Sequence, residues 1–134
     1  MAYWKFLDYV DFDGTNQIEA WIDGLQHSRN VRTRLRVILE HLQDVRGLET
    51  DGYVEPLTGN CSGLVAVKFR LRELACRPMA FKGPDEGEVT ILVGAVKAGR
   101  REYDPRRACE IAFQRQELVE IDRERVCDHD YTQR

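Results

Sequence analysis

The chain has 134 residues, which is the length of a single domain, and 43% of them are hydrophobic and 32% charged, which is typical of a globular protein. No apolar run approaches the roughly 20 residues that a membrane helix needs, and the N-terminal residues lack the basic start and long apolar stretch of a signal peptide. We therefore expect a cytoplasmic protein without a membrane partner. The net charge of -3 disfavours a protein that binds polyanions over its whole surface.

The first part of the chain predicts a strand followed by a helical hairpin. Residues 3–10 are short and aromatic-rich, which favours a strand. Asn16 and Glu19 have the spacing of a capping box and predict the start of a helix. A second helix is predicted over residues 28–46, with Arg29, Arg32, Arg36 and Arg46 on its polar face and Gly47 as its stop. Because the connection between the helices is short, they should be antiparallel.

The rest of the chain predicts three antiparallel strands and a helix. Residues 64–72 alternate apolar and basic, residues 77–82 follow as a strand with Pro78 near its start, and residues 89–96 are almost wholly apolar. The last of these should be the buried central strand. Asp104 and Pro105 have the residue types of a helix N-cap and first position. Beyond about residue 123 the chain is charged and is expected to be a flexible tail. The expected fold is a single α+β domain with one three-stranded sheet.

Cysteine spacing indicates reduced thiols. The chain has no Cys-x-x-Cys pattern and too few histidines near a cysteine for a structural zinc site. The four cysteines are Cys61, Cys76, Cys109 and Cys127.

Positive charge is concentrated in the middle of the chain. Residues 68–107 carry 10 basic and 6 acidic side chains, whereas the segments on either side are net acidic. Lys68, Arg70 and Arg72 alternate along one predicted strand, which spaces them about 7 Å apart, near the phosphate repeat of an extended nucleic-acid strand. The alternative is an ordinary solvated sheet face. Such a face commonly carries both positive and negative side chains, whereas the charged side chains of this one are all positive.

Further polar residues should lie near this strand face, if the hairpins pair simply. They are Arg77, Lys97, Arg100, Arg101 and Tyr103. Side chains alternate between the two faces of a strand, so Arg77 should lie on the same face as Met79 and Phe81, which look like core residues. Arg77 points to the polar face only if a bulge at Pro78 resets the register.

The order of these elements resembles the RelE/HigB/ParE superfamily of type II toxins, and most closely its phage-derived HigB-like branch. The resemblance rests on the run from Gly63 to Arg72, on Arg77, on the apolar strand that ends in Lys97, and on Asp104 with the proline that follows it. It spans roughly residues 3–117.

The resemblance implies a role for each cation. Lys68, Arg70 and Arg72 match the basic strand, and either Lys68 or Arg70 aligns with its arginine. Arg77 matches the arginine that contacts the scissile phosphate, Lys97 closes the last strand, and Tyr103 lies where related toxins have a tyrosine that stacks on RNA or transfers a proton. Arg100 and Arg101 would bind RNA. The chain departs from the family at Ala66, where the family has a glutamate. It also has no histidine between residues 63 and 105 and is acidic overall.

The function that the resemblance implies is that of a toxin from a toxin–antitoxin pair, an mRNA endoribonuclease that inhibits translation with or without the ribosome. Arg70, Arg77, Lys97 and Tyr103 would be its catalytic residues, and no metal or cofactor is implied because fixed cations can stabilise the phosphoryl charge. The expected partners are mRNA and a cognate antitoxin of the helix-turn-helix type. The alternatives are a ParE-like inhibitor of DNA gyrase and a non-catalytic phage protein that binds a host protein.

Overall fold

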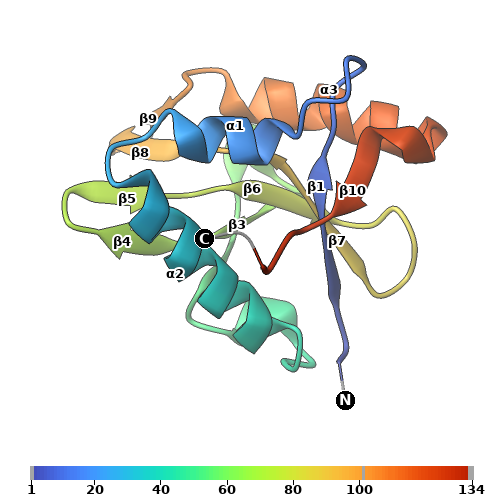
Figure 1. The fold of residues 1–134 in the computed structure, drawn as a ribbon, viewed down its shortest axis with the longest axis horizontal. Coiled ribbons are helices and arrows are strands. Elements are labelled where there is room, and N and C mark those ends of the chain that lie inside the picture. The colour runs from blue at the N-terminus through green and yellow to red at the C-terminus, as the bar shows by residue number, and fades with distance from the viewer. Residues whose placement is uncertain (1, 101, 133–134) are drawn as a thin grey trace.

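The computed structural model describes residues 2–100 and 102–132 and has an α+β fold. Within that part of the chain, three α-helices and ten short strands are arranged with two separate sheets (Figure 1). The elements are β1 (Lys5–Tyr9), α1 (Gln17–Asp23), α2 (Ser28–Leu42), η1 (Leu48–Thr50), β2 (Val54–Pro56), η2 (Gly59–Cys61), β3 (Val65–Val67), β4 (Phe69–Leu71), β5 (Leu74–Cys76), β6 (Met79–Lys82), β7 (Glu88–Val93), β8 (Val96–Gly99), β9 (Glu102–Asp104), α3 (Ala108–Ile121), η3 (Arg123–Arg125) and β10 (Val126–Asp128).

The larger sheet has six strands in the order β10-β1-β7-β6-β3-β2. β7 lies between β1, to which it is parallel, and β6, to which it is antiparallel. Its residues 89–93 are buried, so the prediction of a buried central strand is confirmed for that part of 89–96. α1 packs closely over the end of this strand, because a Cβ at Gly94 would collide with the indole ring of Trp21.

The smaller sheet has four strands in the order β4-β5-β8-β9, and its existence corrects the expected single three-stranded sheet. The chain passes between the two sheets at Lys68, at Arg77–Pro78 and at Gly94–Ala95. Each predicted long strand is therefore divided, 64–72 into β3 and β4 and 89–96 into β7 and β8. Proline lacks the N–H that a continuous strand needs, which accounts for the break after Arg77.

Helices cover both faces of the six-stranded sheet. Alternate β7 residues point to opposite sides, and Val89 and Ile91 share a core with α1 and α2, whereas Leu92 shares one with α3. The predicted cap of α1 is confirmed, because Asn16 Oδ1 accepts hydrogen bonds from the backbone N–H groups of Ile18 and Glu19. The second helix ends at Leu42, four residues before the predicted end.

The structure corrects two predictions about the helices: the exposure of Arg32 and the start of the last helix. Arg32, expected on the exposed face of α2, is buried and pairs with Glu19 and Asp23 on α1. Asp104 does not cap a helix, because it ends β9 opposite Val96, and α3 begins only at Ala108.

The segment beyond residue 123, expected to be a flexible tail, forms η3 and then β10, which pairs antiparallel with β1. His129 follows and is buried against Asp8. The strand adds an edge to the larger sheet, so this segment belongs to the domain. None of the helices that the structure describes is both long and apolar enough to cross a membrane.

Candidate active site

A cavity of about 650 Å³ opens between the loop around η2, the β8–β9 hairpin and the start of α3. Its lining includes four basic side chains and two acidic ones among the described residues: Lys97, Arg100, Arg106, Arg107, Glu55 and Glu110. Tyr103 also lines it. A concave site with an excess of cations and a few convergent polar groups is suited to an anionic ligand.

The pairing of the four-stranded sheet places three of the predicted site residues on one of its faces. Arg70 lies opposite Ala75, and Lys97 lies opposite Tyr103. Cys76 and Val96 pair on the other face, so the residues next to them, Ala75 and Lys97, share the first face. Arg70, Lys97 and Tyr103 therefore lie along one row across the sheet, and the row ends in the cavity.

Arg77 lies where the chain passes from one sheet to the other. Its backbone N–H donates to the carbonyl of Ala95, and its Nη1 donates to the carbonyl of Cys76 over 2.9 Å. Its Nε is buried, has no hydrogen-bond partner among the described residues, and lies 3.9 Å from Glu55 Oε1. β5 ends at Cys76 and β6 starts at Met79, so Arg77 lies in neither strand. The alternation of side chains along β6 therefore does not place Arg77 on the face of Met79 and Phe81. Its side chain is 16% exposed, so it is neither on a wet face nor in the core.

Glu55 is the site residue that the sequence analysis missed. It lies in β2, a short strand that is not among the predicted elements, and it is paired with Ala66 of β3. Ala66 is the position at which the resemblance leads one to expect a glutamate, so a carboxylate stands on the neighbouring strand instead. Its side chain is 34% exposed and it lines the cavity. Only its strand pairing, which the sequence does not predict, reveals it.

Tyr103 keeps its proton at neutral pH. Burial and the nearby charge of Glu55 raise the pKa of its hydroxyl, while Arg77 lowers it by less. Glu55 and Arg77 therefore both act on the hydroxyl of Tyr103, although the three residues come from β2, the β5–β6 connection and β9. A carboxylate, a fixed cation and a neutral phenol are the groups that proton transfer beside a charged phosphate needs.

Other predicted RNA-binding residues lie outside the cavity lining. Arg70 is exposed on the edge strand β4, and Arg72 lies in the β4–β5 turn with a φ of 54°. Lys68 is half-buried between the two sheets, where its N–H donates to the carbonyl of Tyr53. Arg101 lies outside the described residues. The alternating cations of 68–72 therefore do not form one straight strand, because the chain changes sheets at Lys68.

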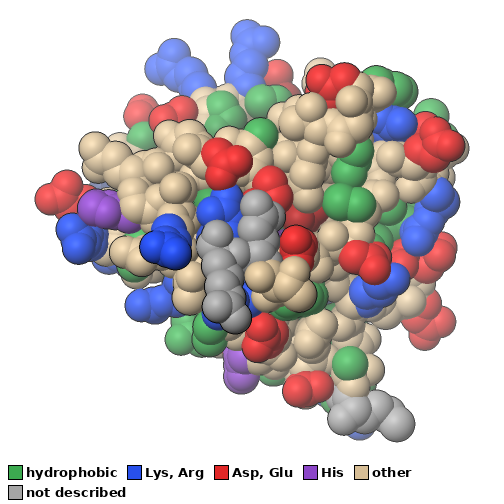
Figure 2. Space-filling view, viewed as in Figure 1, with side chains coloured by type: hydrophobic (Ala, Val, Ile, Leu, Met, Phe, Trp, Pro, Cys, Tyr) green, Lys and Arg blue, Asp and Glu red, His purple; other side chains and the backbone are tan. Residues whose placement is uncertain are grey.

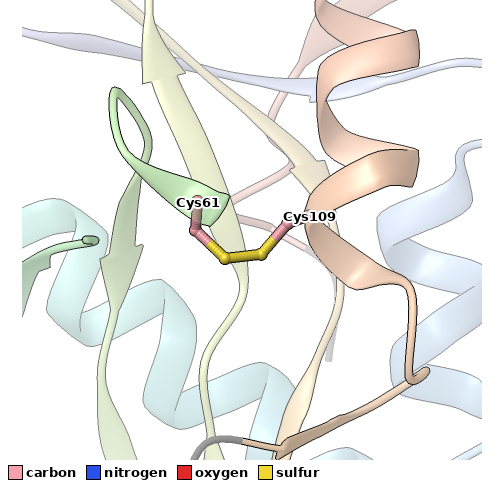
Figure 3. Close-up of a disulfide and its surroundings, with 2 residues drawn as sticks. All are labelled: Cys61 and Cys109. Atoms are coloured by element: carbon pink, nitrogen blue, oxygen red, sulfur yellow. A yellow bond between two sulfur atoms is a disulfide. The ribbon is translucent and has the colours of Figure 1, made fainter. Parts of the chain in front are cut away.

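Two of the four cysteines form a disulfide, which corrects the prediction of four reduced thiols. Cys61 on η2 is bonded to Cys109 in the first turn of α3, with 5.3 Å between their Cα atoms (Figure 3). They are 48 residues apart, and sequence spacing gives no sign that they meet. Stable disulfides are uncommon in reducing compartments, so this bond does not fit the expected cytoplasmic setting well. Burial raises the pKa of the Cys76 thiol to about 11, and Cys127 is also free.

Basic and acidic side chains are intermingled on the face that carries α1, α2 and the C-terminal segment (Figure 2). Within residues 2–100 and 102–132, no group of three or more His, Cys, Asp or Glu side chains is placed to hold a metal ion. Comparison with known proteins finds no matching family model, no matching curated protein and no matching solved structure.

Proposed function

We propose that this protein is a toxin of a type II toxin–antitoxin pair and that it cleaves mRNA at the cavity between η2, β8–β9 and α3. The observation that carries the proposal is that Glu55, Lys97 and Tyr103 line that cavity, with Arg77 next to it, 3.9 Å from Glu55 Oε1. Sequence reasoning independently selects three of these four residues for the same chemistry.

The proposed reaction uses the RNA's own 2′-hydroxyl as the nucleophile. Glu55 accepts the proton of that hydroxyl as the 2′-oxygen attacks the adjacent phosphorus. The bond from phosphorus to the 5′-oxygen breaks, and Tyr103, whose hydroxyl is protonated, donates a proton to the departing oxygen. The products are a 2′,3′-cyclic phosphate and a 5′-hydroxyl end. Each proton that leaves or enters the substrate is accounted for by these two side chains.

Arg77 and Lys97 stabilise the charge that builds on the phosphoryl oxygens. Arginine suits this task because its planar guanidinium group can donate two parallel hydrogen bonds to a phosphate. The guanidinium of Arg77 is held by the Cys76 carbonyl, while its Nε has no acceptor among the described residues. A donor that is positioned but not used within the protein is available to a ligand after a small movement of the side chain.

Arg70 provides the approach of the RNA strand to this centre. It lies on the same sheet face as Lys97, two strands away, which corresponds to roughly 10 Å at ordinary strand spacing. That distance is about one and a half times the phosphate repeat of an extended single strand. Arg100 at the cavity mouth adds a further cation.

A growth experiment tests the proposal against its alternatives. Inducing this protein alone, in a bacterial strain whose cytoplasm allows the Cys61–Cys109 disulfide to form, should slow growth, and incorporation of labelled amino acids should fall before incorporation of labelled thymidine. A variant with Glu55→Gln and Arg77→Ala, produced at the same level, should be harmless. If DNA synthesis stops first with an SOS response, the gyrase-inhibitor function replaces this one. If growth is unaffected, the protein is not a toxin.

The same experiment provides a test for the antitoxin. Co-expression of the neighbouring open reading frame, expected to encode a short helix-turn-helix protein, should restore growth. Purification of the two proteins as one complex would support the pair, and their failure to associate would count against it.

A further inference from the structure

We propose that the Cys61–Cys109 disulfide is a redox switch of the cavity, which has the shape needed to bind its substrate only while the bond is intact. The predicted effect on RNA cleavage rests on the proposed function. The predicted loosening of one cavity wall on reduction does not depend on it.

The disulfide joins two opposite walls of the cavity. Thr58, Gly59 and Asn60 line it from the η2 loop, and Arg106 and Arg107 line it from the segment that leads into α3. Figure 3 shows the bond spanning the space between that loop and the first turn of the helix. Both cysteines also belong to the lining, so the bond lies at the site itself.

The loop has little else to hold its tip. Leu57 and Leu64 are buried at its two ends, and the N–H of Leu57 donates to the carbonyl of Leu64. Between them Cys61 is the single buried residue, and the backbone hydrogen bonds of residues 58–63 stay within 57–64. Without the disulfide the tip is tied to α3 only through the packing of Cys61.

Most of the fold is held by contacts other than this bond, although Cys61 and Cys109 also pack in the core beneath α3. The core beneath α1 and α2 contains neither disulfide cysteine, and the six-stranded sheet is paired along its whole width by backbone hydrogen bonds. We therefore expect reduction to loosen the cavity wall while the sheets persist.

The chemistry of the switch is ordinary thiol–disulfide exchange with a dithiol reductant. One thiolate of the reductant attacks a sulfur of the disulfide, and the other cysteine leaves as a thiolate and takes up a proton. The second thiolate of the reductant then displaces the remaining cysteine. Two electrons pass to the protein, both cysteines become thiols, and the reductant becomes a disulfide.

The experiment compares oxidised and dithiothreitol-reduced protein by hydrogen exchange and by cleavage of a single-stranded RNA oligonucleotide. A variant with Cys61→Ser and Cys109→Ser represents the permanently open state. The matched control carries Cys127→Ser, which removes a free thiol but keeps the disulfide.

Reduction should speed exchange at residues 58–63 and 106–110 at least tenfold while β1, β6 and β7 stay protected. It should lower cleavage about tenfold or more, mainly through a higher KM, and reoxidation should restore it. The double serine variant should behave as the reduced protein, and the control should respond as the unmodified one does.

Equal exchange in both redox states, or loss of protection throughout the sheets on reduction, would overturn the switch. If the oxidised protein cleaves no RNA, the proposed function fails, and the exchange data alone still decide the switch.

Discussion

Two clusters of charged residues in this molecule use their hydrogen bonds in opposite ways. Asp8 is fully buried, accepts a hydrogen bond from Asn16 Nδ2 at 3.1 Å, and has both carboxylate oxygens 3.1 Å from His129 Nδ1. Beside the cavity, by contrast, the buried Arg77 Nε lacks a partner among the described residues and is 3.9 Å from Glu55 Oε1.

The difference separates a structural task from a chemical one. Buried charges that bind each other fix two segments together, and Asp8 with His129 fixes the C-terminal segment to β1. Charges that stay close without satisfying each other retain capacity for a ligand, at a cost in stability. Substitutions in the first cluster should therefore lower stability, and substitutions in the second should lower activity.

The largest effect on stability is expected from Asp8→Ala. Removing one partner leaves His129 buried without its counter-charge, which costs about 3–5 kcal/mol of unfolding free energy. Urea denaturation at neutral pH measures this loss. RNA cleavage by the folded fraction should stay within about twofold of the wild-type rate. A stable Asp8→Ala protein with impaired cleavage would reverse the roles of the two clusters.

Arg77→Ala should have the largest effect on activity. Loss of one fixed cation at a developing phosphoryl charge costs about two to three decades in rate. Since the side chain is mostly buried, a smaller loss of stability should accompany it, well below that of Asp8→Ala. Cleavage rate and urea midpoint should be measured on the same preparation. Arg77→Lys is the matched variant and should recover part of the rate, and wild-type cleavage by Arg77→Ala would remove this residue from the site.

The Asp8–His129 pair should also make stability depend on pH. Burial lowers the pKa of His129, but its hydrogen bond to Asp8 and the negative charges of Asp8, Glu19 and Asp130 together outweigh burial, so the pKa lies above the ordinary 6.5. The stability that the protonated histidine contributes is complete below the unfolded pKa and is lost as the pH rises through the folded pKa. Urea unfolding from about pH 5 to about pH 9 measures it. His129→Gln should remove this part of the pH dependence, and an unchanged profile in that variant would show that another group is responsible.

The smallest effect is expected from Arg70→Ala. An exposed cation that contacts one phosphate contributes modestly, so cleavage should fall less than tenfold. The slope of log affinity against log salt should fall by about 0.7, the value for one phosphate of a single strand. Arg29→Ala on the exposed surface of α2 is the control and should leave that slope unchanged. Equal slopes in both variants would place the RNA path elsewhere.

The sequence predicted best what depends on local pattern. The apolar run of 89–93 became the central strand, and Asn16 caps α1 as expected, because burial periodicity and capping need only neighbouring residues. It failed where distant segments decide the outcome. Nothing near Lys68 signals that the chain changes sheets there, and the division of strands created a second sheet that was not expected.

The candidate site shows the same limit. Lys97 and Tyr103 were selected from residue type and position, and strand pairing places them opposite each other. Glu55 was not selected, because its proximity to Arg77 depends on β2 joining the edge of the larger sheet. The disulfide was missed for the same reason: Cys61 and Cys109 meet only when the η2 loop packs on α3. The final strand β10 was missed because it has only three residues and follows the charged run of residues 122–125.

Cleavage of a 5′-labelled single-stranded RNA by the purified, oxidised protein tests the central claim most directly. We predict cleavage in the presence of a metal chelator, with a 2′,3′-cyclic phosphate on the upstream product. Replacing the nucleotide before the cleaved bond by its 2′-deoxy form should stop it, because the nucleophile is then absent. Glu55→Gln should slow cleavage at least about a hundredfold, the ordinary contribution of a general base. Full activity of Glu55→Gln, or cleavage of the 2′-deoxy substrate at the same bond, would contradict the account.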